Sequence, residues 1–144
     1  MAAVPLLCEK GMFMRKLHVA AGGLVALLLA GTSAWAGLKK TTLVNIDTVA
    51  RNAYGALGAA RASSDTVQYI GCAVLTYSTG NPSIVCNARN AAGTYVSCSS
   101  NAPSMVQAAT ALADGSAINF SWDEAGKCTY LFVENSSEHG TKQP

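Results

Sequence analysis

The cysteines are the feature that most constrains how this chain can fold. The sequence contains five cysteines, and those that follow the first third of the chain are Cys72, Cys86, Cys98 and Cys128. They are separated by 13, 11 and 29 residues, unlike the closely spaced pairs of a structural zinc site. An even set of cysteines in a small domain instead predicts two disulfides, formed in an oxidising compartment. We therefore expect disulfides and no metal site.

The N-terminus has the three-part layout of a secretory signal peptide. A basic stretch at residues 14–18 precedes an apolar run over residues 19–30, and Ala34 and Ala36 match an A-x-A cleavage site. The run is about a dozen residues long, shorter than the roughly 20 that a membrane-spanning helix needs. We predict cleavage after Ala36, a secreted or periplasmic product, and membrane contact only during export. Residues 1–13 exceed what a leader requires and form a candidate N-terminal extension.

Removal of the leader changes the charge and the cysteine count. The whole chain has 10 Lys and Arg, 8 Asp and Glu, and a formal net charge of +2. The leader contains three of the basic residues, one acidic residue and Cys8, so residues 37–144 are neutral and keep an even set of cysteines. A neutral domain with dispersed basic residues lacks the positive surface that nucleic-acid binding requires. We therefore expect no nucleic-acid partner.

Most of the remaining chain consists of β-type runs separated by turn residues. We predict strands at Thr41–Val49, Gln68–Tyr77, Ile84–Arg89, Thr94–Ser99, Ala117–Trp122 and Lys127–Glu134. The segment Asn52–Ser64 has no clean period, and we expect a loop or a close backbone contact through its small residues. If Cys72, Cys86 and Cys98 lie on successive strands, two pairings are favoured. These are Cys72–Cys86 with Cys98–Cys128, and Cys86–Cys98 with Cys72–Cys128.

The hydrophobic period becomes helical between Asn101 and Gly115. The apolar residues that follow this spacing are Met105, Val106, Ala109, Leu112 and Ala113. Pro103 suits the first helical turn, Ser100 or Asn101 suits the N-cap, and Gly115 suits the C-cap. We predict one helix, with its apolar stripe packed on a sheet.

The last two strands are expected to form a hairpin with a four-residue loop, Asp123–Gly126. This loop places Trp122 opposite Lys127 and Phe120 opposite Thr129. One face then carries Ile118, Phe120, Trp122, Leu131 and Val133, and the other carries Cys128, Tyr130 and Phe132. Because both faces are apolar, we expect the helix to cover one. Residues 38–64 or a second subunit would cover much of the other.

Together these elements predict an α+β fold. We expect an antiparallel sheet of about five to six strands, built from hairpins, with one helix packed on one face. An all-β sandwich is the alternative. The domain is expected to span residues 37–135, and the polar residues 136–144 to form a flexible tail.

Three stretches resemble members of a group of small exported bacterial proteins of unassigned activity. They are Gln68–Cys72, Cys86–Asn90 and the segment from Phe120 to Tyr130. The similarity extends over residues 41–135. The resemblance implies an exported, disulfide-bonded domain, and it implies no catalytic or binding residue.

Residues suited to catalysis are few. His139 is the sole histidine after the leader, and its place among polar residues leaves a serine or cysteine nucleophile without a base. Asp123 and Glu124 are the candidate carboxylates of a small secreted hydrolase that acts on glycans. Carboxylates in an exposed turn lack the burial that raises the pKa of a catalytic acid. We therefore predict a non-catalytic protein without a cofactor, and keep the hydrolase as the alternative.

Binding is the better-supported class of function. Amphipathic aromatic rings on sheets serve many binding surfaces, and arginine orients carboxylates or glycans. The candidate ligand-binding residues are Tyr69, Arg89, Tyr95 and Tyr130, whereas Phe120 and Trp122 are expected in the core. We predict an exported binding module or a cell-surface or extracellular component. Its partner would be a protein, a glycan or another copy of the chain.

Overall fold

The computed structural model describes residues 37–140, so the predicted leader and its cleavage site lie outside the described residues, as do residues 141–144. In chain order the elements are β1 (Asn45–Asp47), β2 (Asn52–Ala56), α2 (Leu57–Arg61), β3 (Tyr69–Leu75), β4 (Ser83–Arg89), β5 (Tyr95–Ser100), α3 (Pro103–Thr110), β6 (Ser116–Trp122), β7 (Cys128–Asn135) and the 3-10 turn η1 (Ser137–His139). All strand pairs within the sheets are antiparallel. The predicted α+β class is therefore confirmed.

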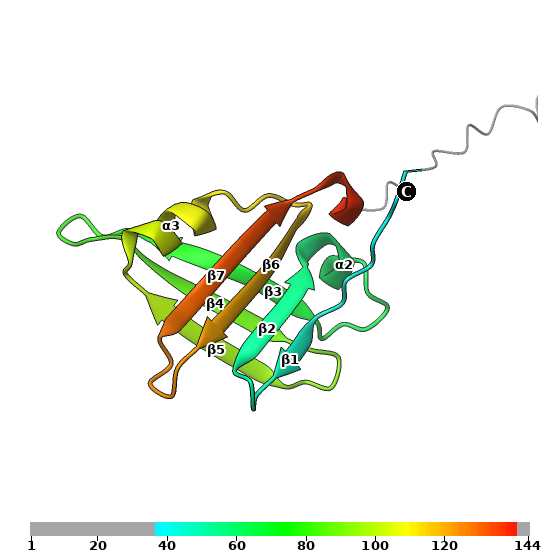
Figure 1. Cartoon of the computed structure of the whole chain (residues 1–144), viewed down its shortest axis with the longest axis horizontal. Coiled ribbons are helices and arrows are strands. Elements are labelled where there is room, and N and C mark those ends of the chain that lie inside the picture. The colour runs from blue at the N-terminus through cyan, green and yellow to red at the C-terminus, as the bar shows by residue number, and fades with distance from the viewer. Residues whose placement is uncertain (1–36, 141–144) are drawn as a thin grey trace, which may run out of the picture. The chain divides into compact units, whose positions relative to one another are not determined.

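The strands divide into two sheets, β1-β2-β6-β7 and β3-β4-β5. The expected single sheet is wrong, because β6 pairs with β2 rather than with the hairpins of β3 to β5. Figure 1 shows the four-stranded sheet lying across the three-stranded sheet, with the strands of the two layers crossing. The buried residues of both sheets form one cluster, so each sheet covers the inner face of the other.

The core lies between these two inner faces. Ile118 and Phe120 of β6 and Ile84 and Cys86 of β4 are almost completely buried and belong to one continuous cluster. Ala53 of β2 pairs with Phe120 and is likewise fully buried. The ring of Phe120 lies 6.0 Å, centroid to centroid, from that of Trp122, which packs against the same cluster. The expected core placement of both aromatic residues is confirmed.

Within residues 37–140, the helices α2 and α3 contact the ends of the layers. α3 contacts β3, β4 and β7, and α2 contacts β2, β3 and β6. Val106 and Ala109 of α3 are buried, and Met105 and Leu112 pack against the core, which confirms most of the predicted stripe. α3 does not cover one face of a sheet as expected, because the second sheet occupies that position.

The C-terminal end of α3 also differs from the prediction. The helix begins at Pro103, as expected, but ends at Thr110 with Ala111 as its C-cap. Ala113 and Ser116 then hydrogen-bond each other, through Ala113 N to Ser116 Oγ and Ser116 N to the carbonyl oxygen of Ala113. This turn directs the chain into β6. The helix therefore stops well before Gly115.

The segment Asn52–Ser64, in which the sequence showed no clean hydrophobic period, forms β2 and α2. Its small residues allow close packing, because a Cβ atom at Gly55 would lie 3.2 Å from Cα of Val44. The expected close backbone contact is present, although it lies in a strand rather than a loop. Alanine and glycine have weak strand propensity, so pairing with β1 on one side and β6 on the other determines this conformation.

The β6–β7 hairpin has a different register from the predicted one. Asp123 lies opposite Lys127, because Asp123 N donates to the carbonyl oxygen of Lys127. The loop therefore consists of residues 124–126, one fewer than predicted, and ends at Gly126 with a φ of 73°. Trp122 therefore pairs with Cys128 instead of Lys127. A β-bulge follows at once, and leaves Thr129 as the extra residue on β7.

Cys128 lies between these two shifts, and this position directs its side chain. Strict alternation along β7 would place Cys128 on the same face as Tyr130, as the sequence predicted. The bulge reverses that placement, so Cys128 joins Trp122 and Phe120 on the buried side. Beyond the bulge, the shorter loop and the bulge together shift the register by two residues from the predicted one. A shift of two leaves each side chain on its predicted face. Phe120 then faces Leu131, and the rest of the predicted core face is confirmed.

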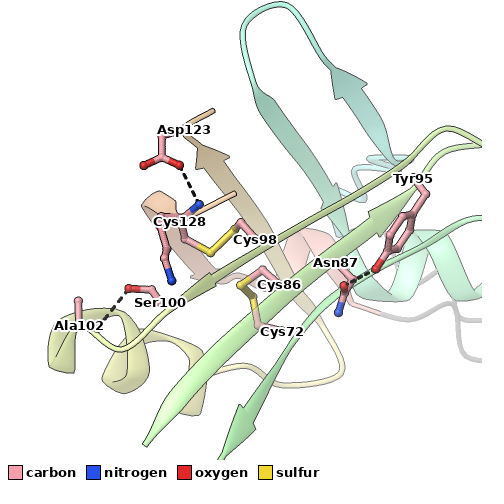
Figure 2. The surroundings of a disulfide bond; sticks show 10 residues. Cys72, Cys86, Asn87, Tyr95, Cys98, Ser100, Ala102, Asp123 and Cys128 are labelled. Carbon is pink, nitrogen blue, oxygen red and sulfur yellow. Dashed lines mark hydrogen bonds between the residues drawn. A yellow bond between two sulfur atoms is a disulfide. The ribbon is translucent and has the colours of Figure 1, made fainter. Parts of the chain in front are cut away.

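Two disulfides hold the described domain, and both lie on the core side (Figure 2). Cys72, Cys86 and Cys98 form one row across β3, β4 and β5. Cys72 is bonded to Cys86 within this sheet, with a Cα–Cα distance of 4.0 Å. Cys98 is bonded to Cys128 of the other sheet, at 5.1 Å. The first of the two favoured pairings is therefore present.

The end of the described chain packs on the domain. Lys40 N donates to the carbonyl oxygen of Glu138 at 2.8 Å, and His139 is only 3% exposed. The expected flexible tail is therefore wrong for residues 136–140, which form η1 and its flanks. The prediction of a loose segment rested on its polar residues alone. It missed the contact with Lys40, which lies almost 100 positions earlier in the sequence.

Removal of either disulfide should lower the free energy of unfolding, and the bond between the sheets should matter more. The Cys98–Cys128 bond spans 30 residues and the Cys72–Cys86 bond spans 14. Loop-closure entropy then gives about 4 and about 3 kcal/mol respectively. Urea unfolding of the two paired Cys→Ala variants measures this order. A larger loss for Cys72→Ala with Cys86→Ala would contradict it.

Two phenylalanines on opposite faces of one sheet provide a matched comparison of burial. Phe120→Ala should cost about 3–5 kcal/mol, because the ring is fully buried between the sheets. Phe132→Ala should cost less than about 1 kcal/mol, since that ring is 46% exposed. Chemical denaturation of both variants tests the assignment of faces. Equal losses would show that the outer face is also covered.

Candidate binding surface

Three of the four predicted ligand-binding residues lie side by side. Tyr69 of β3 pairs with Arg89 of β4, which pairs with Tyr95 of β5, so the three form one row across the sheet. Their neighbours Ile70 and Ala88 are buried, and alternation therefore directs the row to the outer face. The tyrosines are 42% and 49% exposed. We call these three residues the arginine row.

The guanidinium of Arg89 lies against both tyrosine rings. Its Cζ atom is 5.9 Å from the ring centroid of Tyr69 and 5.6 Å from that of Tyr95, and the two centroids are 6.5 Å apart. The Tyr95 hydroxyl donates to Oδ1 of Asn87 at 2.8 Å, as Figure 2 shows. Cation–π contacts at exposed sites contribute about 0.5–1 kcal/mol each. They restrict the guanidinium to few orientations before any ligand arrives.

Arg89 differs from the other arginines in its charge environment. Arg51 forms an ion pair with Glu124 at 2.6 Å, and Arg61 lies 3.8 Å from Asp114. Within residues 37–140, Arg89 forms no ion pair with a carboxylate. Its planar fork of N–H donors is therefore available to an external anion, and it fits a carboxylate in bidentate geometry.

A turn capped by the side chain of Asp65 precedes Tyr69, the first residue of the arginine row. Asp65 Oδ1 accepts hydrogen bonds from the backbone N–H groups of Val67 and Gln68 at 2.9 and 2.7 Å, and Oδ2 accepts from the Gln68 amide. Gln68 Oε1 in turn accepts from Val44 N at 2.9 Å. The hydrogen bonds from Gln68, side chain first and then backbone, lower the pKa of Asp65 to about 2. Tyr69 follows directly and is positioned by this network.

Tyr130, the fourth predicted residue, lies elsewhere. It projects from the outer face of the four-stranded sheet, which also carries Tyr54 and Phe132, all three exposed. The register places Asn119 between Tyr54 and Phe132. Residues 38–64 do not cover this face as expected, because their strands extend the edge of the sheet. Sequence reasoning missed Tyr54, since the strand that orients it lacked a β pattern.

The two carboxylates of the hydrolase alternative have structural partners. Asp123 Oδ1 accepts from Lys127 N at 2.8 Å and closes the hairpin loop. Glu124 forms the ion pair with Arg51, and its side chain is exposed. Each carboxylate is therefore engaged in holding the turn. Neither lies in the buried surroundings that a catalytic acid requires.

Sequence reasoning also missed a cluster at the end of β7. Glu134, Glu138 and His139 bring two carboxylates and one imidazole together. Beside them is a cavity of about 160 Å³, whose lining includes Lys40, Thr42, Glu134 and His139. No pattern in the sequence indicated this cluster, because η1 must fold back on the domain before it forms.

No protein-family model, curated protein or solved structure matches this chain. The two disulfides confirm a small disulfide-bonded domain, whereas the membership of a bacterial group and the export of the chain stay predictions. Across residues 37–140, the helices are too short or too polar to cross a membrane.

The Asp65 network predicts a pH dependence in the acid range. A carboxyl group whose pKa falls from 3.8 to about 2 on folding contributes stability above about pH 4, and this contribution is lost as the pH falls toward 2. Asp65→Asn should therefore unfold more readily than the wild type at pH 6, and the difference should vanish below pH 2. Urea titrations across this range measure it. A difference that stays constant with pH would contradict the assignment.

Proposed function

We propose that this chain is an exported, non-catalytic binding module that recognises a carboxylate-bearing glycan at the arginine row. One observation carries the proposal: the exposed guanidinium of Arg89 lies against the rings of both Tyr69 and Tyr95 and has no acidic partner among the described residues. Arginine is favoured where planar, bidentate recognition of a carboxylate is needed. A uronic acid supplies that carboxylate together with hydroxyl groups.

The surface beside the arginine row suits the rest of a sugar ring. The next outward-facing row contains Gly71, Asn87 and Ser97. A Cβ atom at Gly71 would meet nothing within 4 Å, so this strand leaves open space above the sheet. The side chains of Asn87 and Ser97 offer donors and acceptors for hydroxyl groups. The two rows together present a charged contact next to polar contacts, as an acidic sugar requires.

Export of the domain is part of the proposal. The two disulfides are typical of oxidising compartments such as the periplasm or the extracellular space. The predicted leader and its cleavage after Ala36 supply the route. A released protein and a cell-surface component both agree with these features.

The hydrolase alternative has weaker support than binding. It would use Asp123 and Glu124, which already hold the β6–β7 turn through Lys127 N and Arg51. The arginine row contains no carboxylate or imidazole for acid–base chemistry. The free guanidinium therefore favours a ligand that is held rather than cleaved.

Arg89 variants test the proposed binding site. The purified, oxidised protein is applied to an array of uronic-acid glycans and their neutral counterparts, and affinities for the hits are measured by calorimetry. Arg89→Gln should weaken binding at least about tenfold. Arg89→Lys should also weaken it, because an ammonium group lacks the planar fork. Tyr69→Ala should have a smaller effect, since it removes one of the two rings that hold the guanidinium.

Arg61→Gln is the matched control, because Arg61 is exposed, is not a member of the arginine row and has an acidic partner, Asp114, at 3.8 Å. This variant should bind as the wild type does. Equal affinities for acidic and neutral glycans, or an Arg89→Gln variant with unchanged affinity, would refute recognition through the carboxylate. An array without any acidic-glycan hit would refute the ligand class.

A further inference from the structure

The cluster at the end of β7 brings three candidate metal ligands to one point. His139 Nε2 lies 3.2 Å from Oε2 of Glu134 and 3.4 Å from Oε1 of Glu138. One donor atom from each residue lies within 4.8 Å of the other two. Glu134 comes from β7, and the other two come from η1, which folds against the start of the described chain.

The imidazole is buried and, among the residues that the structure describes, has no partner outside this cluster. The side chain of His139 is 2% exposed, and within the described part of the chain its Nδ1 atom is buried without a hydrogen-bond partner. A neutral imidazole has a single N–H group, so it cannot donate to both carboxylates from Nε2. Two negative groups therefore converge on one buried nitrogen, an arrangement that a bound cation would balance.

We propose that Glu134, Glu138 and His139 form a Zn²⁺ site. Zinc binds histidine nitrogen and carboxylate oxygen at about 2.0–2.1 Å in a tetrahedron, which separates neighbouring ligand atoms by about 3.3–3.4 Å. The two distances from His139 Nε2, 3.2 and 3.4 Å, are close to that separation. An octahedral Mg²⁺ ion with bonds of about 2.1 Å would bring ligands to about 3.0 Å and prefers oxygen. The mixed nitrogen and oxygen set therefore favours zinc.

The surroundings leave a route to the site and room for a fourth ligand. The side chains of Glu134 and Glu138 are 39% and 25% exposed, so a cation reaches the cluster from the carboxylate side. The cavity of about 160 Å³ beside Glu134 and His139 is large enough for water. The described residues supply one such set of three ligands. One ion per chain is the expected stoichiometry.

This site is independent of the proposed glycan surface. It lies on β7 and η1, whereas the arginine row lies on the other sheet. Its effect would be to fasten η1 to β7, because the metal would bond to both elements. A loss of metal binding would therefore leave binding at Arg89 unchanged, and the two proposals fail separately.

Zinc titration of the full chain, with its disulfides intact, tests the site. All proteins carry Cys8→Ser, which removes the thiol outside the disulfides. Calorimetry should show one Zn²⁺ per chain, and thermal unfolding should shift to a higher temperature with added Zn²⁺ and return with a chelator. Glu134→Gln and Glu138→Gln should each weaken binding at least about tenfold, since an amide is a poorer ligand than a carboxylate. Glu124→Gln is the matched control and should bind as the wild type does.

Cobalt provides a readout of geometry that an ordinary ion pair would not give. Co²⁺ bound in place of Zn²⁺ should show the strong visible absorption of a tetrahedral site. A faint octahedral spectrum, no stoichiometric Zn²⁺ binding, or unchanged affinity in both glutamate variants would overturn the proposal. Because His139 is buried, His139→Gln is interpreted only if its far-UV circular dichroism matches that of the wild type. With the fold intact, it should bind no Zn²⁺.

Discussion

The bond between Cys98 and Cys128 joins the two sheets at the place where their apolar faces meet, and the remaining structure depends on that closure. The core is small, with Phe120 as its largest fully buried side chain, so a covalent tie contributes a large share of the few kcal/mol that separate folded and unfolded states. This packing buries the inner faces of both sheets. Recognition is therefore left to the outer faces and to the edges of the sheets.

The sequence predicted the elements that carry a strong period, and it failed where the pattern depends on neighbours. The hairpins of β3 to β5 and the start of α3 follow from their own residues. β2 does not, because alanine and glycine become a strand only between two partners. The sequence also could not predict which face of the sheet Cys128 lies on, because that face depends on both the shorter loop and the β-bulge. The division into two sheets then follows from pairings distant in sequence.

The same distinction applies to the candidate sites. Tyr69, Arg89 and Tyr95 could be singled out because amphipathic rings and an arginine lie on predicted strands, and the register then brings them into one row. Tyr130 has the same chemistry, but it belongs to the other sheet. His139 was discounted because its neighbours in sequence are polar. Its burial comes from contact between the first and last described segments, which no local pattern records.

The row of three cysteines across β3, β4 and β5 has a consequence for the order in which the chain oxidises. Cys86 lies between Cys72 and Cys98, directly opposite each, so within this sheet alone two bonds compete for one sulfur atom. Cys128 follows Cys98 by 30 residues, and synthesis runs from the N-terminus. Until the last hairpin has docked, Cys98 remains a competitor for Cys86. Thiol–disulfide exchange would correct a premature bond, and arrival of β7 withdraws Cys98 from the competition.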